Sequence, residues 1–204
     1  MGIMERKKIA ALVIVLVITA GTASVFFMIR ESGDANKPNV LAEQRTYIDQ
    51  KSGVNINHPV DSKVSSISEE DKKANIILRL NEKEGETPYL ITLRSESGLR
   101  AVATLTRSEI IDMLMNNSER ALPQRFTGFQ KVSSRRYEHN GRKAGEIIFT
   151  YDSPVEGERI KQRFVVLVKD DDTAVYLAMQ AREADFDEQN TKIFDPMAES
   201  LNFQ

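Results

Sequence analysis

Short runs of alternating apolar and polar residues dominate the chain from Tyr47 onward. The runs that begin at Val54, Ile76 and Tyr89 each place apolar side chains at every second position. A period of two with one apolar face is typical of half-buried antiparallel strands. The pattern therefore predicts three strands in the first half of this region.

Four longer runs follow and predict an antiparallel meander of consecutive strands. They cover Phe129–His139, Arg142–Tyr151, Ile160–Val168 and Thr173–Arg182. Asn140-Gly141 separates the first two runs, and this dipeptide tolerates the positive φ angles that a two-residue hairpin turn needs. The last two runs are joined by Asp170-Asp171-Asp172. We interpret this triplet as a solvated turn, because it lacks the alternate spacing, the glycine and the distal glutamate of a calcium loop.

One helix is expected where the alternation breaks at Thr106. Thr106 and Glu109 form a capping box, in which each side chain accepts a hydrogen bond from a free amide at the start of the helix. The apolar stripe that follows consists of Ile110, Met113 and Leu114. Pro123 cannot continue the hydrogen-bond ladder and ends the helix.

A second helix is expected near the carboxyl end. Asp185 is a candidate N-cap with Glu188 three residues later. Pro196 conflicts with an unbroken helix, so an end or a kink is expected near Phe194–Asp195. A short apolar tail that ends at Phe203 should pack back on the sheet.

The first 30 residues follow a different pattern. Ile9–Ile29 is 21 residues long and carries no charge. A helix of that length rises about 30 Å, the hydrocarbon thickness of a bilayer. Arg6, Lys7 and Lys8 precede the run, and this bias places the amino end in the cytoplasm and the carboxyl end across the membrane. We therefore expect a single-pass cell-membrane protein, with a cytoplasmic stub and transmembrane anchor in 1–30.

Two alternatives for this segment stay open. A cleaved signal peptide would use Ile9–Thr19 as its apolar core and Gly21-Thr22-Ala23 as its cleavage site. The apolar run continues through Val25–Ile29, where a signal peptide normally turns polar. A buried soluble helix is the other alternative, although Ile9–Ile29 is apolar all round rather than on one face.

Composition limits the remaining choices. Glu31–Arg45 is polar, contains glycine and proline, and is expected to be a flexible linker to an extracytoplasmic α+β domain in 46–204. The chain has no cysteine, which excludes disulfides, thiol nucleophiles and thiolate metal sites. Of 28 basic and 30 acidic residues, the first 30 positions hold four and one, which leaves a balance of −5 in 31–204. A mildly acidic domain lacks the basic footprint of a nucleic-acid-binding protein.

The layout resembles the PsbP-like fold, which is shared by PsbP-like and DcrB-like proteins. The residues that carry the resemblance are Gly53-Val54-Asn55-Ile56-Asn57-His58-Pro59, the helix after Thr106, the late meander, and the closing Phe194…Ser200-Leu201-Asn202-Phe203. The match covers about residues 47–203, and the region after Pro59 has no tryptophan where family members often carry one. The resemblance implies an antiparallel sheet flanked by helices, and a non-catalytic accessory protein that serves a membrane complex. No metal or binding residue of the family maps onto a matching motif, so no cofactor is expected.

The candidate chemistry is sparse. His58 and His139 are the two histidines, and both stand at predicted strand ends. The sequence has no nucleophile motif, no phosphate-binding loop and no HExxH zinc motif. We therefore expect a protein that is not an enzyme. An exported metal-dependent enzyme is the alternative, because carboxylates are abundant, and a scaffold or assembly subunit is a third possibility.

Basic residues on the predicted meander form the one candidate binding site. Arg159, Lys161 and Arg163 alternate along one strand, so their side chains share a face. The proposed partner-docking set consists of Arg135, Arg136, Arg142, Lys143, Arg159, Lys161 and Arg163. If the strands are neighbours, these cations fall on one solvent-facing surface that suits an acidic protein partner in the same membrane or anionic lipid head groups. The alternative is a solubilising strand face whose cations pair with Glu138, Glu146, Glu156 and Glu158.

Overall fold

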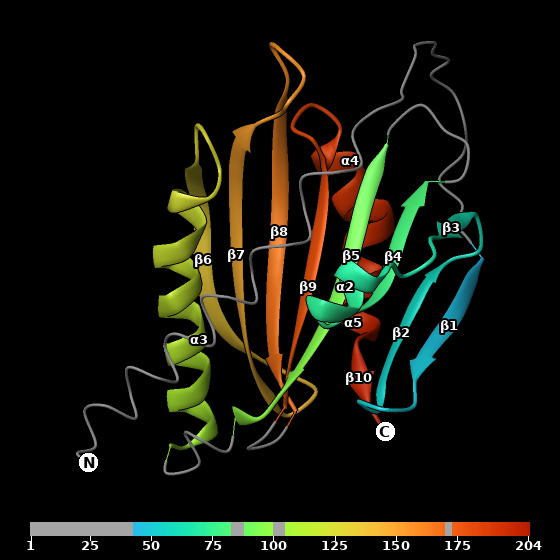
Figure 1. Cartoon of the computed structure of the whole chain (residues 1–204), viewed down its shortest axis with the longest axis vertical. Helices are drawn as coiled ribbons and strands as arrows, with labels where there is room; N and C mark the ends of the chain where they lie inside the picture. The colour runs from blue at the N-terminus through green and yellow to red at the C-terminus, as the bar shows by residue number, and fades with distance from the viewer. Residues whose placement is uncertain (1–42, 83–87, 100–104, 170–172) are drawn as a thin grey trace.

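The computed structural model describes residues 43–82, 88–99, 105–169 and 173–204, and its described strands form two antiparallel sheets (Figure 1). The large sheet has the order β3-β4-β5-β9-β8-β7-β6, and the small sheet has the order β1-β2-β10. In the first half of the chain the strands are β1(Gln44–Asp49), β2(Val54–Pro59), β3(Ser62–Val64), β4(Ile76–Glu82) and β5(Tyr89–Ser97). In the second half they are β6(Gln130–His139), β7(Arg142–Asp152), β8(Arg159–Val168), β9(Thr173–Arg182) and β10(Asn202–Phe203).

The predicted meander is confirmed, because β6, β7, β8 and β9 are consecutive neighbours. Asn140 and Gly141 have φ angles of 50° and 73°, as a two-residue hairpin turn between right-twisted strands requires. The Asp170-Asp171-Asp172 turn lies outside the described residues.

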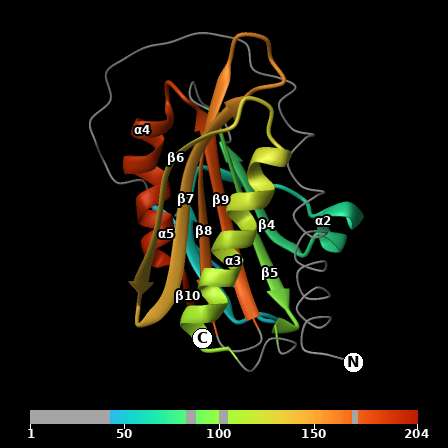
Figure 2. The ribbon, with the colours of Figure 1, turned by 90° about the vertical axis from the view of Figure 1, so that its left-hand side faces the viewer.

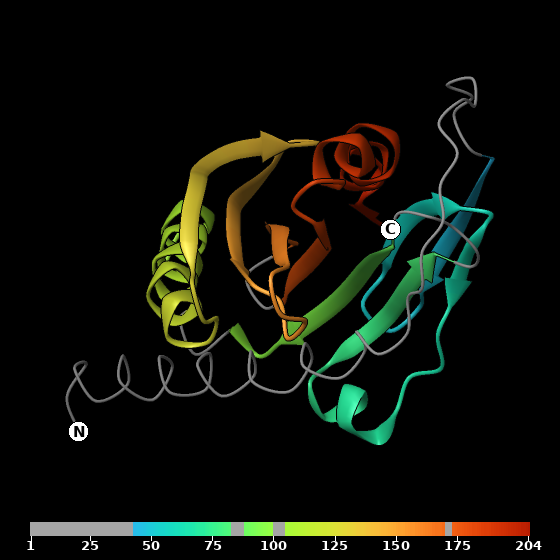
Figure 3. The same cartoon turned by 90° about the horizontal axis from the view of Figure 1, so that it is seen from above.

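Helices cover the two faces of the meander (Figures 2 and 3). α3(Arg107–Ala121) packs on β7 and β8 from one side. The carboxyl-terminal helical segment, which consists of α4(Phe186–Gln189), a π-helical turn (Asn190–Phe194) and α5(Asp195–Ser200), lies on the other side. Two separate apolar clusters fill the space between the sheet and these layers. β8 is buried on both faces along most of its length.

α3 begins as the sequence predicts. The Thr106 amide donates to Glu109 Oε2 at 2.7 Å, and the Glu109 amide donates to Thr106 Oγ1 at 3.3 Å. Ile110 and Leu114 are buried, and the helix passes into a short 3-10 turn (Leu122–Gln124) that contains Pro123. The capping box and the stop signal are both confirmed.

The second helix is only partly as predicted. Asp185 makes no cap hydrogen bond, because its carboxylate accepts from Arg182 Nε at 2.6 Å instead. The expected irregularity near Asp195 is present as the π-helical turn, after which α5 starts with Pro196 in its first turn. Proline is tolerated there because an amide in the first turn has no intrahelical partner. The tail then pairs as β10 with β2, which makes a small second sheet that the sequence did not predict.

Two further differences concern the start of the domain. β1 begins at Gln44, so the last two residues of the expected linker belong to a strand. A short helix, α2(Glu69–Lys73), was not predicted; Ser68 and Asp71 form its capping box, and Asp71 Oδ1 accepts from Arg79 Nη2 at 2.5 Å. Within the described ranges no helix has both the length and the apolar character needed to cross a bilayer. Ile9–Ile29 lies outside these ranges.

Candidate functional site

The seven cations of the predicted docking set do not lie on one surface. Their strands β6, β7 and β8 are neighbours, but alternation sends the side chains to two faces of the sheet. The register pairs Arg135 with Glu146 and Arg136 with Gly145, so these two arginines point in opposite directions. Arg136 reaches α3, where its Nε donates to Asp112 at 2.7 Å. Lys143 shares that face and donates to Glu138 at 2.7 Å.

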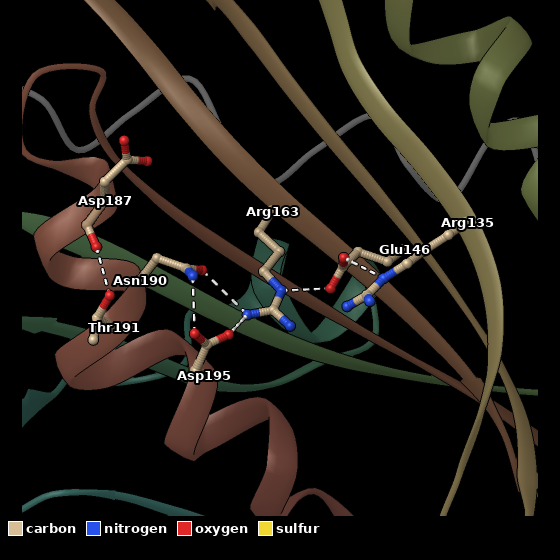
Figure 4. Close-up of polar contacts among 7 residues, drawn as sticks. All are labelled: Arg135, Glu146, Arg163, Asp187, Asn190, Thr191 and Asp195. Carbon is tan, nitrogen blue, oxygen red and sulfur yellow. Dashed lines mark hydrogen bonds and ion pairs between the residues drawn. The ribbon is translucent and has the colours of Figure 1, made fainter.

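Arg163 is buried rather than solvent-facing, which corrects the sequence prediction. Its guanidinium donates from Nε to Glu146 Oε2 at 2.6 Å and from Nη1 to Asp195 Oδ1 (Figure 4). The Arg163 and Glu146 side chains are 8% and 4% exposed. The cause is the carboxyl-terminal helical segment, which covers this face of β8 and which strand periodicity alone cannot place.

Further polar groups complete this ion network. Arg135 Nε donates to the second oxygen of Glu146 at 2.9 Å, while its side chain stays 60% exposed. Asn190 accepts from Arg163 Nη1 at 3.1 Å and donates to Asp195 Oδ2 at 3.1 Å. We call Arg135, Glu146, Arg163, Asn190 and Asp195 the ion network (Figure 4). Its buried charges are paired and hydrogen-bonded, as buried charges must be.

The ion network also sets proton affinities. Burial alone would lower the pKa of Arg163, but the charge of Glu146 and the hydrogen bonds to Asp195 and Glu146 outweigh it and raise that pKa. Burial raises the pKa of the Tyr137 phenol, the Glu146 charge raises it further, and Arg163 and Arg135 act in the opposite direction. Arg135 also lies over the Tyr137 ring, 5.0 Å from its centroid.

The two remaining cations of β8 are also neutralised within the chain. Lys161 donates to Asp187 Oδ1 at 2.8 Å. Arg159 donates to Asp152 Oδ1 at 2.7 Å and to Glu183 Oε2 at 3.2 Å. The cations of β8 therefore pair with acidic side chains, as the alternative interpretation proposed, and do not form an open docking surface. Of the glutamates expected to pair with them, only Glu146 does so; the other acids are Asp152, Glu183, Asp187 and Asp195.

Arg142 alone among the seven pairs with no carboxylate in the described part of the chain. It donates to the Lys169 carbonyl and lies 5.0 Å from the centroid of the Phe203 ring. Lys169 lies near the same ring, and its Nζ donates to the Ser52 carbonyl at 2.7 Å. These contacts fasten β10 and the β1–β2 turn to the end of β8.

A cleft of about 370 Å³ lies beside that turn, where the small sheet meets the large one. Three parts of the chain form its walls: the β1–β2 turn, the end of α2 with the start of β4, and the ends of β5 and β9. The lining residues are Asp49, Lys51, Ser52, Lys72, Asn75, Ile76, Ile77, Ser95, Ser97 and Thr173. We call this feature the junction cleft.

Polar groups of the junction cleft fall into two classes. Asp49 accepts from the Ser52 amide at 2.8 Å and from its hydroxyl at 2.5 Å, and Lys72 donates to Glu69 at 2.6 Å. By contrast, the side chains of Lys51, Asn75, Ser95 and Ser97 have no hydrogen-bond or ion-pair partner among the described residues. Ile76 and Ile77 add an apolar wall. The arrangement offers hydrogen-bond donors and a positive charge to a ligand.

Sequence reasoning missed the junction cleft because its residues are far apart in the chain. Thr173 on β9 pairs with Ser97 on β5, although the two residues are 76 positions apart in the sequence. The sequence predicts a turn at Ser95–Gly98, but β5 continues through Ser97. No local signal marks the cleft residues, since only the packing of two sheets brings them together.

The two histidines have structural partners. His58 is buried and its Nδ1 donates to the Pro59 carbonyl at 2.9 Å. His139 Nε2 donates to the Leu201 carbonyl at 2.7 Å. In the described residues, no group of three or more His, Asp or Glu side chains is arranged to hold a metal ion.

The fold is PsbP-like, as the sequence resemblance predicted. The solution structure of cyanobacterial PsbP (CyanoP) from Synechocystis sp. PCC 6803 matches with a TM-score of 0.52 and 12% identity, over 84% of this chain and 98% of that one. LpqN of Mycobacterium tuberculosis, described as involved in cell envelope biogenesis, matches with a TM-score of 0.53 and 12% identity, over 79% and 91%. A protein of Bacteroides thetaiotaomicron VPI-5482 matches with a TM-score of 0.51 and 7% identity, over 81% of this chain and 49% of that one. No family model and no curated protein matches the sequence.

Proposed function

We propose that this chain is a membrane-anchored, extracytoplasmic binding module that serves as a non-catalytic accessory to a membrane protein complex. The observation that carries the proposal is the junction cleft, whose walls present four unengaged donor side chains and an apolar surface. Such a set holds and orients a ligand. Activating the Ser95 or Ser97 hydroxyl would need a base within hydrogen-bond reach, and neither hydroxyl has such a contact in the described residues.

The anchor and its orientation rest on the sequence. Ile9–Ile29 has the length and apolar character of a single span, and the basic residues Arg6, Lys7 and Lys8 precede it. On this proposal the amino terminus is cytoplasmic and the domain in 46–204 lies outside the cytoplasm. Attachment to the membrane would raise the local concentration of the domain near its partner.

The solved structures of similar fold support an accessory role by analogy. CyanoP is a PsbP protein, and LpqN is described as involved in cell envelope biogenesis. Analogy of fold is weaker support than a shared site, because one fold can carry unrelated functions.

Partner docking by the seven cations is retained in a narrower form. Arg135 and Arg136 lie on the edge strand β6, with side chains 60% and 38% exposed. We propose that an acidic protein partner docks along this edge strand, where Arg135 projects to one face of the sheet and Arg136 to the other. Each exposed contact contributes about 0.2–1 kcal/mol, so docking would depend on several of them together.

Protease access tests the topology. Protease added to intact cells, with any outer membrane opened, should digest the domain from residue 46 to residue 204. Protection of the whole domain would reverse the proposed orientation. A free domain that begins at Ser24 would show that the amino-terminal segment is cleaved.

Capture of partners tests the accessory role. The full chain, solubilised in neutral detergent, should retain a specific membrane protein after cross-linking in cells, and mass spectrometry would identify it. A matched variant with Arg135→Glu and Arg136→Glu should retain less of that protein at low salt. Metal-dependent turnover of a substrate by the purified protein would show that the non-catalytic proposal is wrong.

A further inference from the structure

We propose that the junction cleft binds a small soluble oxyanion, a phosphate ester or a carboxylate, that carries a short apolar group. This inference rests on the proposed binding function and names the ligand class of that site. Lys51 would supply the charge, and Asn75, Ser95 and Ser97 would supply directional hydrogen bonds.

The free donors carry the argument. The Lys51 ammonium, the Asn75 amide and the Ser95 and Ser97 hydroxyls all line the cleft, and none donates to another described residue. Ser95 and Ser97 are two positions apart on β5, so they lie on the same face of the strand, as do alternate residues of any strand. Several donors from separate elements that converge on one cleft match the several acceptor lone pairs of an oxyanion.

The charge balance also favours an anion. The cleft lining holds two lysines, Lys51 and Lys72, and one carboxylate, Asp49, whose Oδ2 accepts both hydrogen bonds from Ser52, at 2.8 Å and 2.5 Å. Lys169 approaches the β1–β2 turn and donates to the Ser52 carbonyl at 2.7 Å. The β1–β2 turn therefore has two ammonium groups near it, that of Lys169 and that of Lys51, and the Lys51 group has no partner among the described residues.

The volume and the apolar wall of the cleft indicate a small ligand that has an apolar group beside its anionic group. A volume of about 370 Å³ is at the lower end of the range for small-molecule sites, which is about 300–1,000 Å³. Ile76 and Ile77 line it beside the polar groups. An inorganic anion would leave this apolar wall wet, whereas an organic phosphate or carboxylate would cover it.

The junction cleft lies at the end of β1 that is remote from the amino-terminal segment. The described chain enters through β1 at Gln44, and Asp49 at the far end of the strand lines the cleft. Six strand residues span roughly 17–20 Å. The test below includes an anionic lipid as well as soluble anions, because the 13 residues before β1 (31–43) span about 45 Å when fully extended.

Amide chemical shifts of the full chain in neutral detergent provide the test. Phenyl phosphate should shift the amides of cleft residues saturably, and inorganic phosphate should bind more weakly, because it cannot cover the apolar wall. Benzyl alcohol, which lacks the charge, should leave these amides unshifted. Lys51→Ala should weaken phenyl phosphate binding about three- to fivefold, and Lys51→Ala with Ser97→Ala about tenfold. Lys63→Ala is the matched control, because Lys63 is also exposed and has no described partner but lies outside the cleft.

The outcomes separate this inference from the proposed function. Saturable shifts that appear only when phosphatidylglycerol is added to the micelle would overturn the soluble ligand in favour of a lipid head group. No shift with any probe, or equal weakening by Lys63→Ala, would overturn the site itself. Partner capture tests the accessory role independently of these results. If the cleft binds phenyl phosphate but no partner is captured, the ligand inference holds and the accessory role is wrong.

Discussion

The ion network and the junction cleft both present basic side chains, but their cations stand in opposite situations. In the ion network, Arg163 is buried and bound to two carboxylates. In the cleft, Lys51 is exposed and has no described partner. A buried charge without a partner is very costly, so the network must satisfy itself within the chain. Lys51 can stay free because water solvates it, and it is therefore available to a ligand. Sequence position alone does not distinguish these two roles.

The largest expected effect comes from removing the buried cation of the ion network. Arg163→Ala should lower the free energy of unfolding by about 3–5 kcal/mol, because it leaves Glu146 buried with only the exposed Arg135 as a partner. Denaturant melts would measure the change. The double variant Arg163→Met with Glu146→Leu should regain most of the loss, since it removes both charges and keeps the volume. A loss below about 1 kcal/mol for Arg163→Ala would show that the network is solvated and would break the comparison.

A smaller effect is expected at the rim of the cleft. Asp49→Ala removes the acceptor of two hydrogen bonds from Ser52 and should destabilise the domain by about 1–2 kcal/mol. Asp49→Asn, which keeps an acceptor oxygen, should recover part of this loss. Thermal melts of the two variants would sharpen the distinction between cleft residues that hold the fold and those that are free. Equal stability of Asp49→Ala and the parent would remove Asp49 from the first group.

The free residues of the cleft should be nearly neutral for stability. Lys51→Ala and Ser97→Ala should each change the free energy of unfolding by less than about 0.5 kcal/mol, because both side chains are exposed and neither has a described partner. The measurement is the same denaturant melt as for Arg163→Ala. A clear destabilisation by either variant would mean that the side chain has a structural role and would weaken the argument for a ligand.

The smallest effect is a change in proton affinity. Burial and the Glu146 charge raise the pKa of Tyr137 above its ordinary value of 10.0. Glu146→Gln should lower that pKa, because the charge disappears while the opposing arginines remain. Since the folded pKa lies above the unfolded one, Tyr137 contributes stability that is complete below pH 10 and is lost as the pH rises through the folded value.

Phenolate absorbance during alkaline titration would follow this change. Tyr137→Phe identifies the contribution of Tyr137, because burial also raises the pKa values of Tyr151 and Tyr176. A titration curve that does not move in Glu146→Gln would show that the network charge does not reach the phenol.

Local patterns in the sequence determined most of the secondary structure. Alternation placed the four strands of the meander, Asn140-Gly141 fixed its first turn, and Thr106 with Glu109 fixed the start of α3. These signals act between residues close in the chain, where backbone sterics and capping decide the outcome. Asp185 shows the limit, because a partner three residues earlier, Arg182, took the carboxylate that should have capped the helix.

The tertiary structure decided which side chains are free. A strand period of two puts Arg163 and Lys161 on one face, but it cannot say whether that face meets water or the carboxyl-terminal helices. Here Asp195 and Asp187 close over them. The same holds for the junction cleft, whose walls come from Lys51, Asn75 and Ser97 on three elements. The burial of a side chain and its hydrogen-bond partners depend on contacts between segments that are distant in the sequence. In this chain those contacts bury Arg163 in the ion network, and they leave the side chains of Lys51 and Ser97 accessible to a ligand.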